Sequence, residues 1–309
     1  MIKKNAVSVN QLTKIYAKKS KNSVVALNKL NLEVKEGEIF GLLGPNGAGK
    51  TTFINILAGT VIKTSGNVNL WGYDLDKDPR QVRASIGIVP QEVNLDAFFS
   101  PRRLLELQAG LYGIPKKNRI TGDILKMVSL EKQAESYSRS LSGGMKRRLL
   151  IAKAMVHQPP ILVLDEPTAG VDVELRQNLW ENVKNLNKQG VTIILTTHYL
   201  YEAQEMSDRI AILNKGNLVV LDTTTNLLNR IKTKKITFKV NKTIDLSQKK
   251  TDSFTFYSNK NNEITVTYER NKHKIEDIID IIKNEGVEIV DISTEDGNLE
   301  DVFIQLTKN

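Results

Sequence analysis

One segment near the start of the chain constrains its fold more than any other. Residues 44–51 read Gly-Pro-Asn-Gly-Ala-Gly-Lys-Thr, which fits G-x-x-x-x-G-K-[ST], between the apolar run Ile39–Leu43 and the helix-like run Thr51–Ala58. The glycines let backbone N–H groups turn inward around phosphate oxygens, and the positive end of the following helix points at the same anion. The segment therefore predicts a phosphate-binding loop between a buried strand and a helix.

The chemistry of this loop predicts a role for each part. We expect Lys50 to reach the β- and γ-phosphates of a nucleotide and the Thr51 hydroxyl to coordinate Mg²⁺. The predicted nucleotide contacts are Gly44, Pro45, Asn46, Gly47, Ala48, Gly49, Lys50, Thr51 and Thr52. By itself the loop indicates nucleotide binding and leaves open which kind of NTPase carries it.

A second apolar run ends in two acidic residues. Ile161–Leu164 is followed by Asp165 and Glu166. At the carboxyl end of a strand beside the phosphate loop, Asp165 can hold Mg²⁺ directly or through water. Glu166 can then polarise the attacking water as a general base. The pair predicts ATP hydrolysis rather than nucleotide binding alone.

A third segment has the form of a second anion site. Leu141-Ser142-Gly143-Gly144-Met145 precedes a basic helix over Lys146–His157, and Ser142 with the two glycines makes a helix start suited to a phosphate. One nucleotide needs one cradle, so a second is explained if it serves the nucleotide of a second copy of the chain. Together the three segments resemble the ABC ATPase family, whose signature loop acts in this way across a head-to-tail dimer.

The resemblance covers about residues 6–222 and implies further site residues. Gln91 is similar to the family's glutamine that touches Mg²⁺ or water, and Asp172 to the aspartate of the loop after the acidic pair. His198 is similar to the histidine beside the γ-phosphate, and Tyr16 to the aromatic residue that stacks on adenine. The resemblance thus implies catalytic roles for Glu166, His198 and Gln91, metal binding by Thr51, Gln91 and Asp165, and contacts of Tyr16, Asp172, Ser142, Gly143 and Gly144 with ATP.

Several segments look closest to the drug- and polysaccharide-type bacterial exporters of the type-two ABC family. They include Thr196–Ile210 and the tail segment Leu299-Glu300-Asp301-Val302-Phe303. Met145 departs from the family, in which many members have Gln. The resemblance implies an ATP-hydrolysing homodimer, with ATP and Mg²⁺, that powers transport through a separate transmembrane permease. Export follows from the subfamily only.

The implied fold is α/β, a P-loop NTPase of the ABC ATPase type. It has a parallel core sheet, an antiparallel β subdomain and a helical insertion at about 92–157. Alternating strand-like runs after a polar stretch predict a small α+β domain over 230–309, which leaves 1–229 for the nucleotide-binding domain. Expected strands in the first domain are 6–9, 30–34, 39–43, 161–164 and 191–195, with helices near 101–112 and 175–187 and a hairpin over 210–221. In the tail we expect strands at 236–240, 254–257 and 264–268 and helices at 274–284 and 299–307.

Composition limits the alternatives. The chain has no Cys, which excludes thiolate catalysis and disulfides, and no run approaches the ~20 apolar residues of a spanning helix. We therefore expect a cytoplasmic protein, peripheral on the inner face of the membrane. The net charge of +9 lies in residues 1–229, since residues 230–309 carry 14 basic and 14 acidic side chains. It indicates either attraction to polyanions or acidic membranes, or a solvated lysine-rich surface.

Two functions compete with transport. A chromosome-associated or DNA-repair ABC ATPase would separate the phosphate loop from the signature by a long coiled coil, and no sustained heptads lie between Thr51 and Leu141. A ribosome-associated ABC ATPase would carry two sets of motifs. No basic patch interleaved with aromatics stands out, so we expect no nucleic-acid partner. A nucleotide-dependent regulator stays open at this point.

Overall fold

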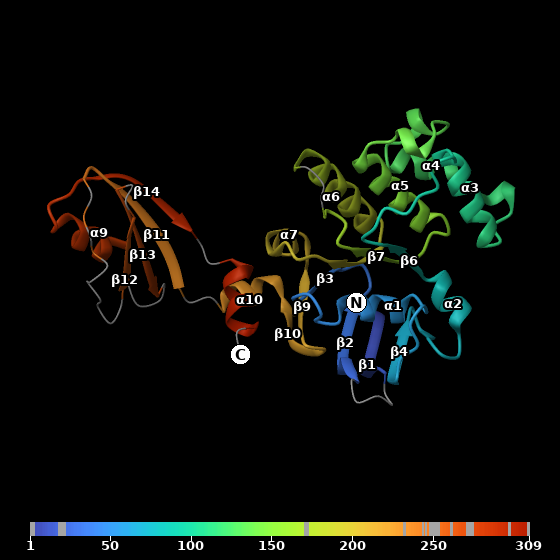
Figure 1. Ribbon diagram of the computed structural model, residues 1–309, viewed down its shortest axis with the longest axis horizontal. Coiled ribbons are helices and arrows are strands. Elements are labelled where there is room, and N and C mark those ends of the chain that lie inside the picture. The colour runs from blue at the N-terminus through green and yellow to red at the C-terminus, as the bar shows by residue number, and fades with distance from the viewer. Residues whose placement is uncertain are drawn as a thin grey trace. The chain divides into compact units, whose positions relative to one another are not determined.

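The structure is a computed structural model, which describes residues 4–17, 23–169, 173–230, 233–242, 244, 246, 254–259, 262–269, 275–295 and 298–307. The chain forms two compact units, Met1–Thr223 and Thr224–Asn309, whose elements are labelled in Figure 1. The sequence places the boundary at 229/230. Helix α8 (Thr224–Asn229) belongs to the second unit, where it packs against α10 (Leu299–Thr307).

A six-stranded sheet forms the centre of the first unit, in the order β10-β9-β3-β8-β7-β6. Neighbouring strands are parallel except for β10, which forms an antiparallel hairpin with β9. The strands are β3 (Ile39–Leu43), β6 (Ile86–Val89), β7 (Ile161–Asp165), β8 (Thr192–Thr196), β9 (Arg209–Asn214) and β10 (Asn217–Thr223). Every residue of β3, β7 and β8 is buried, as their uninterrupted apolar runs predict for strands covered on both faces.

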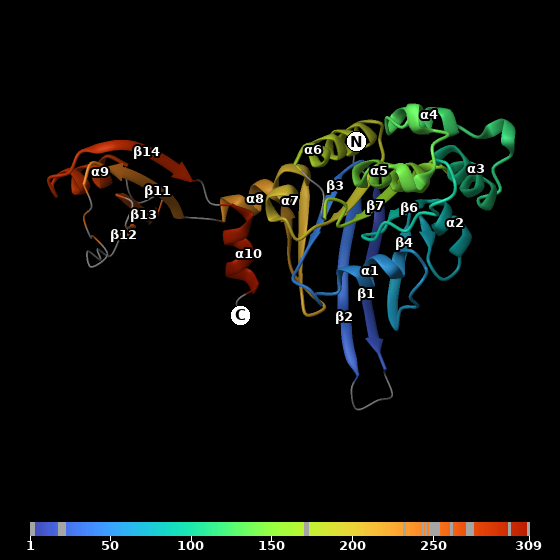
Figure 2. The same cartoon turned by 45° about the horizontal axis from the view of Figure 1, so that its top comes forward.

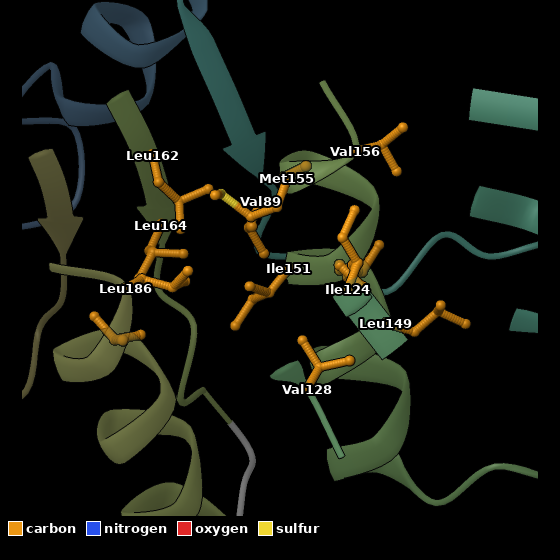
Figure 3. Packing of buried hydrophobic residues seen from close by; sticks show 14 of the residues in the cluster. Val89, Ile124, Val128, Leu149, Ile151, Met155, Val156, Leu162, Leu164 and Leu186 are labelled. Atoms are coloured by element: carbon orange, nitrogen blue, oxygen red, sulfur yellow. The ribbon is translucent and has the colours of Figure 1, made fainter. Parts of the chain in front are cut away.

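Alternate residues of β7 point into two separate apolar clusters. Leu162 and Leu164 face helices of the insertion, and Figure 3 shows them directed toward Ile151 and Met155. Ile161 and Val163 face the opposite way, into a cluster with Phe53. This period of two fixes the layers: helices α5 and α6 lie on one side of the core strands and β1, β2 and β4 on the other (Figure 2).

A four-stranded antiparallel sheet covers that second side, in the order β2-β1-β4-β5. Its strands are β1 (Asn5–Tyr16), β2 (Val24–Lys35), β4 (Ser65–Leu70) and β5 (Tyr73–Asp74). Leu30, Leu32 and Val34 on β2 are buried and alternate with exposed residues, so one face of this sheet packs on the core. Helices α1 (Lys50–Leu57) and α2 (Pro79–Ala84) complete this side.

The helical insertion follows β6. It contains α3 (Pro101–Leu111), α4 (Thr121–Met127), α5 (Gly143–Met155) and the short 3₁₀ turns Lys116–Asn118, Glu131–Gln133 and Ser138–Ser140. The start of α3 is fixed as predicted, because the Ser100 hydroxyl accepts a hydrogen bond from the Arg103 amide at 3.3 Å and Pro101 is the first helical residue. Helices α6 (Val173–Lys188) and α7 (Leu200–Met206) belong to the core.

The second unit is a four-stranded antiparallel sheet, in the order β12-β13-β11-β14, with an amphipathic helix. Its elements are β11 (Thr233–Val240), β12 (Phe254–Asn259), β13 (Glu263–Glu269), α9 (Ile275–Lys283) and β14 (Ile289–Glu295), with α8 and α10. Ile236, Phe238 and Val266 pack with Ile278 and Ile282 of α9 in one apolar cluster. In neither unit do the described residues include a helix with the length and apolar character needed to cross a bilayer.

Candidate functional site

The phosphate loop connects β3 to α1, and two of its positions accept only glycine. Gly49, which caps α1, has φ of 108°, and a Cβ there would lie 2.5 Å from the carbonyl oxygen of Ala26 on β2. At Gly44 a Cβ would lie 2.4 Å from the carbonyl oxygen of Leu213 on β9. The backbones of β2 and β9 therefore confine the loop from two sides.

The turn between β9 and β10 adds direct hydrogen bonds to this confinement. The amide of Gly216 donates to the carbonyl of Ala48 in the loop at 3.1 Å, and the Gly216 carbonyl accepts from the amide of Asn28 at 2.9 Å. Gly216 has φ of 79°, a conformation that glycine adopts without strain. A residue far along the chain thus holds the phosphate loop to the antiparallel sheet.

An open cavity of about 870 Å³ lies over this loop. It brings together six segments of the first unit, namely the end of β1, the start of β2, the phosphate loop and the loops after β6, β7 and β8. Residues 44–52 all line it, and so do the predicted Tyr16, Gln91, Glu166 and His198, together with Val24, Val25 and Ala26. An aromatic ring beside apolar side chains at one end and a glycine-rich loop at the other suit a base and its phosphates.

Lys50 is the cation of the loop. Its side chain is buried, and Nζ donates to the carbonyl oxygens of Gly44 at 2.7 Å and Pro45 at 3.3 Å. Burial lowers the pKa of Lys50, and the carboxylates of Glu166 and Asp165 act in the opposite direction. An ammonium group with so little contact to water is suited to an anionic ligand such as phosphate.

Asp165, the last residue of β7, is more buried than its neighbour Glu166. Its Oδ1 accepts a hydrogen bond from Oγ1 of Thr196 at 2.6 Å. Burial raises the pKa of Asp165, the Thr196 hydrogen bond lowers it, Glu166 raises it and Lys50 lowers it, with a net increase. The hydrogen bond and the nearby lysine thus offset only part of the cost of burying this charged carboxylate. A bound cation would stabilise its charged form further.

The donor set around Asp165 fits Mg²⁺ held largely by a substrate. The described residues contain no group of three or more His, Cys, Asp or Glu side chains that could hold a metal ion. Mg²⁺ prefers oxygen ligands and commonly binds through one or two protein groups plus phosphates and water. Asp165 and the Thr51 hydroxyl are of that kind.

Glu166 lies in a strained turn directly after the carboxyl end of β7. Its φ is 46°, a left-handed conformation that is uncommon outside glycine. Its amide donates to the carbonyl oxygen and to Oγ1 of Thr196, both at 3.1 Å. Thr196 therefore fixes both acids, since its hydroxyl accepts from the Glu166 amide and donates to Asp165.

The side chain of Glu166 contacts residues of two other loops, the one after β6 and the one after β8. Its Oε2 accepts from Nε2 of Gln91 at 2.9 Å and lies 3.1 Å from Nδ1 of His198. The structure thus brings together the three residues that the sequence proposes for catalysis. The imidazole is about half exposed and packs against the ring of Tyr199, with centroids 4.1 Å apart.

Two functional groups escaped prediction from the sequence. Thr196 follows an apolar run and looks like an ordinary strand end. Glu202 on α7 is buried, and its Oε2 accepts from the hydroxyls of Thr168 at 2.7 Å and Thr197 at 3.2 Å. Glu202 thereby joins the loops that carry Glu166 and His198. Thr196 lies 30 residues from Glu166 in the sequence, and Glu202 lies 34 from Thr168, so no local pattern marks either of them.

The signature segment does not join this cavity. Ser142 caps α5, its Oγ accepting from the Met145 amide at 3.3 Å, and Ser142, Gly143 and Gly144 are absent from the lining residues. Ser142 and Gly143 are exposed, whereas the Met145 side chain packs on the apolar cluster of the insertion. Asp172 lies outside the described residues.

The comparisons with known proteins agree with this geometry. Residues 27–169 match the family model described as ABC transporter. The chain is 37% identical, over 227 residues, to the linearmycin resistance ATP-binding protein LnrL of Bacillus subtilis (strain 168), covering 73% of this chain and 71% of that protein. It is 41% identical to the Nod factor export ATP-binding protein I of Rhizobium sp. (strain N33), covering 64% of this chain and 66% of that protein.

Solved structures share the fold of the first unit. One is the dimeric structure of an ATP-binding cassette in a post-hydrolysis state bound to ADP and Pi, with 29% identity and a TM-score of 0.62. That match covers 71% of this chain and 98% of the cassette. The α/β fold with a parallel core sheet, an antiparallel sheet and a helical insertion, as the sequence predicts, is confirmed.

Proposed function

This chain belongs to the ABC transporter family of ATP-hydrolysing proteins, and we propose that it powers export through a separate membrane-spanning partner. Relatives named for Nod factor export and linearmycin resistance support export over import. The single observation that carries the proposal is the position of Glu166. Its carboxylate accepts a hydrogen bond from Gln91 and contacts His198, within the same cavity as the phosphate loop.

The polar residues in and beside the cavity have distinct parts in binding and hydrolysis. The glycine-rich loop and Lys50 bind the phosphates of ATP, and Tyr16 packs against the adenine. Glu166 accepts a proton from the attacking water, while Gln91 and His198 orient its carboxylate at 2.9 and 3.1 Å. Thr196 holds Asp165 and Glu166 in register. Asp165 and Thr51, with Gln91, would hold Mg²⁺, which neutralises charge on the transferred phosphoryl group.

The exposed signature segment supports a head-to-tail homodimer. Ser142 and the two glycines after it begin α5, a helix of 13 residues whose positive end suits an anion. Because they do not line the cavity of their own chain, we propose that they cap the ATP of a second copy. Solved structures of this fold include dimeric ATP-binding cassettes, one of them bound to ADP and Pi.

A groove on the first unit supports docking of the membrane partner. It holds about 470 Å³ and is lined by residues of β6 and α1 on one side and of α3 and α5 on the other. Pro90 and Asn94, which flank Gln91, also line it. We propose that a segment of the permease docks here, so that movement of the insertion reaches Gln91 and through it Glu166. The chain then acts at the inner face of the membrane.

The proposal is tested by trapping the dimer. Glu166→Gln keeps the shape of the side chain and removes the base, so hydrolysis should fall by roughly 10²- to 10⁴-fold while Lys50 and Asp165 still bind Mg-ATP. ATP should then persist between subunits, and light scattering should detect an ATP-dependent dimer of the variant.

The matched variant is Glu166→Gln with Ser142→Arg. It should bind ATP as a monomer and form no dimer, because the bulky cation blocks closure on the other subunit's γ-phosphate. The dimer model is wrong if Ser142→Arg abolishes ATP binding by the monomer. It is also wrong if the Glu166→Gln variant forms no ATP-dependent dimer alone or with its membrane partner.

A further inference from the structure

One buried arginine lies between the signature helix and the catalytic loops. Arg147 is on the second turn of α5, close after Ser142, and only 8% of its surface is exposed. Its Nη1 donates to the carbonyl oxygens of Gln91 and, at 3.4 Å, of Pro90. Its Nη2 donates to the carbonyl oxygen of Ala169 at 3.2 Å. A single guanidinium thus contacts two loops that are far apart in the sequence.

Both of those loops lead to the same carboxylate. Gln91, whose backbone Arg147 holds, donates its side-chain Nε2 to Glu166 at 2.9 Å. Ala169 donates its amide to the carbonyl oxygen of Glu166 at 3.2 Å. Arg147 is therefore connected to Glu166 through one intervening residue in two ways. Gln91 makes the connection to the Glu166 side chain, and Ala169 makes it to the Glu166 backbone.

We infer that Arg147 is a positioning residue, which ties the Gln91–Glu166 pair to the helix that begins at Ser142. This inference rests on the proposed function, in which Ser142 serves the ATP of the other subunit. One subunit takes part in two ATP sites, through Ser142 in one and through Glu166 in the other. Arg147 is then the link within a subunit by which occupancy of one site sets the geometry of the base in the other.

The shape of arginine suits this task better than that of lysine. Its planar guanidinium carries five N–H donors in a fixed fork, so it can bond to separate carbonyl oxygens at once. A lysine ammonium is a single point on a flexible stem and cannot span both loops in one geometry. Small displacements of a catalytic group from residues outside the chemistry can cost about 10²-fold in rate.

The next residue along the helix provides a matched control. Arg148 also donates to two backbone carbonyl oxygens, those of Val128 at 2.9 Å and Ser129 at 3.1 Å. Both belong to the insertion, and neither of these hydrogen bonds to the described residues leads to Gln91 or Glu166. Arg148 therefore shares with Arg147 its helix, its charge and its kind of hydrogen bond, and differs in what it holds.

The experiment measures steady-state ATP hydrolysis, Mg-ATP binding and thermal unfolding of the full chain in five forms: wild type, Arg147→Lys, Arg147→Met, Arg148→Lys and Arg148→Met. We expect Arg147→Met to lower kcat by roughly 10- to 100-fold, with Arg147→Lys between it and wild type. The KM for ATP and the Kd for Mg-ATP should change by less than about threefold, since the phosphate loop is untouched. The Arg148 variants should unfold at lower temperature and keep kcat within about threefold of wild type.

The inference is wrong if Arg147→Lys retains the wild-type kcat, or if the Arg147 and Arg148 variants lose kcat in the same proportion. It is also wrong if the loss appears in KM rather than in kcat. If Arg147→Met fails to fold, Arg147→Lys alone decides the question. A wild-type chain without ATPase activity would instead contradict the proposed function, so the two failures are distinguishable.

Discussion

The two units of this chain differ in the kinds of side chain that they bury. In the first, the buried polar or charged side chains include Lys50, Arg147, Asp165, Thr196 and Glu202, most of them at or behind the nucleotide cavity. In the second, Thr224 is the single buried polar side chain among the residues that the structure describes there. Burying charged groups lowers the stability of the first unit at the place where a reaction occurs, whereas the buried side chains described in the second unit are almost all apolar.

The difference also appears in how each sheet is covered. The strands β3, β7 and β8 are buried on both faces, and polar residues follow where they end. In the second unit the buried residues Ile236, Phe238 and Val240 alternate along β11 with partly or fully exposed ones. Two covered faces leave the strand ends as the place for chemistry. In the second unit the described residues of the covered face form one apolar cluster.

The largest effect that this comparison predicts is on Lys50. Lys50→Ala removes the only side-chain cation of the phosphate loop, so ATP hydrolysis should fall by at least about 10³-fold and Mg-ATP binding should weaken strongly. The matched control is Lys239→Ala, which removes an exposed lysine from β11 in the second unit. Steady-state ATPase assays of both variants make the test. An Lys50→Ala chain within a few-fold of wild type would refute the phosphate-loop assignment.

The next effect is on stability and is confined to the second unit. Phe238 is fully buried in the apolar cluster of that unit. Phe238→Ala should destabilise the unit by about 3–5 kcal/mol, the usual cost of removing a buried phenyl ring. Thermal unfolding should show this loss, while kcat for ATP stays within about threefold of wild type.

The control for Phe238 is its neighbour Thr237, which points to the other face of β11 and bonds to Thr265 through the two hydroxyls at 3.0 Å. Thr237→Ala should cost only about 1 kcal/mol. Loss of ATPase activity in Phe238→Ala at a temperature where the first unit stays folded would mean that the second unit takes part in the catalytic cycle.

The smallest effect is a pH dependence of the first unit. The ring of His157 stacks on Tyr112, with centroids 3.8 Å apart, and its Nδ1 is buried without a hydrogen-bond partner among the described residues. Burial lowers the pKa of His157 below 6.5, against the smaller effect of the hydrogen bond to the Ile86 carbonyl. Below pH 6.5 the unfolded chain therefore binds more protons than the folded one.

The free energy of unfolding should consequently fall as pH drops from 6.5 through the lower pKa of the folded state, by at most about 1.4 kcal/mol per pH unit. His157→Phe keeps an aromatic ring and removes the titration, so its unfolding free energy should decline less over the same range. Urea unfolding of both chains between pH 7.5 and 5 measures the difference. Equal slopes would show that the folded state holds His157 with an ordinary affinity for protons.

The sequence predicted best the elements whose residues alone determine them. Strand β3 and the hairpin of β9 and β10 are confirmed, because a short buried apolar run and an Asn-Lys-Gly-Asn turn are local signals. For β1 the prediction stopped at Val9, whereas the strand runs to Tyr16 through irregular pairing after Val9. Strand β4, with Gly66 and Asn67, has poor strand propensity and exists because β1 pairs with it.

The residues of the candidate site likewise fall into those that the sequence predicted and those that it did not. Motif residues such as Lys50 and Glu166 were proposed from the sequence and meet in one cavity. Thr196 bonds to Glu166 directly, whereas Arg147 bonds to the backbone of Gln91, whose side chain bonds to Glu166. Each of these contacts spans a large separation in the chain. A supporting contact of that kind depends on which strands and helices become neighbours. No local pattern in the sequence encodes it.

The turn that joins β9 to β10 changes how this protein can be engineered. Exposed hairpin turns are ordinarily the places where a chain accepts added residues, and tags or reporter domains are placed there. Here Gly216 bonds to the phosphate loop through Ala48 and to β2 through Asn28. An insertion at this turn would displace Ala48 and with it the phosphate loop that lines the nucleotide cavity.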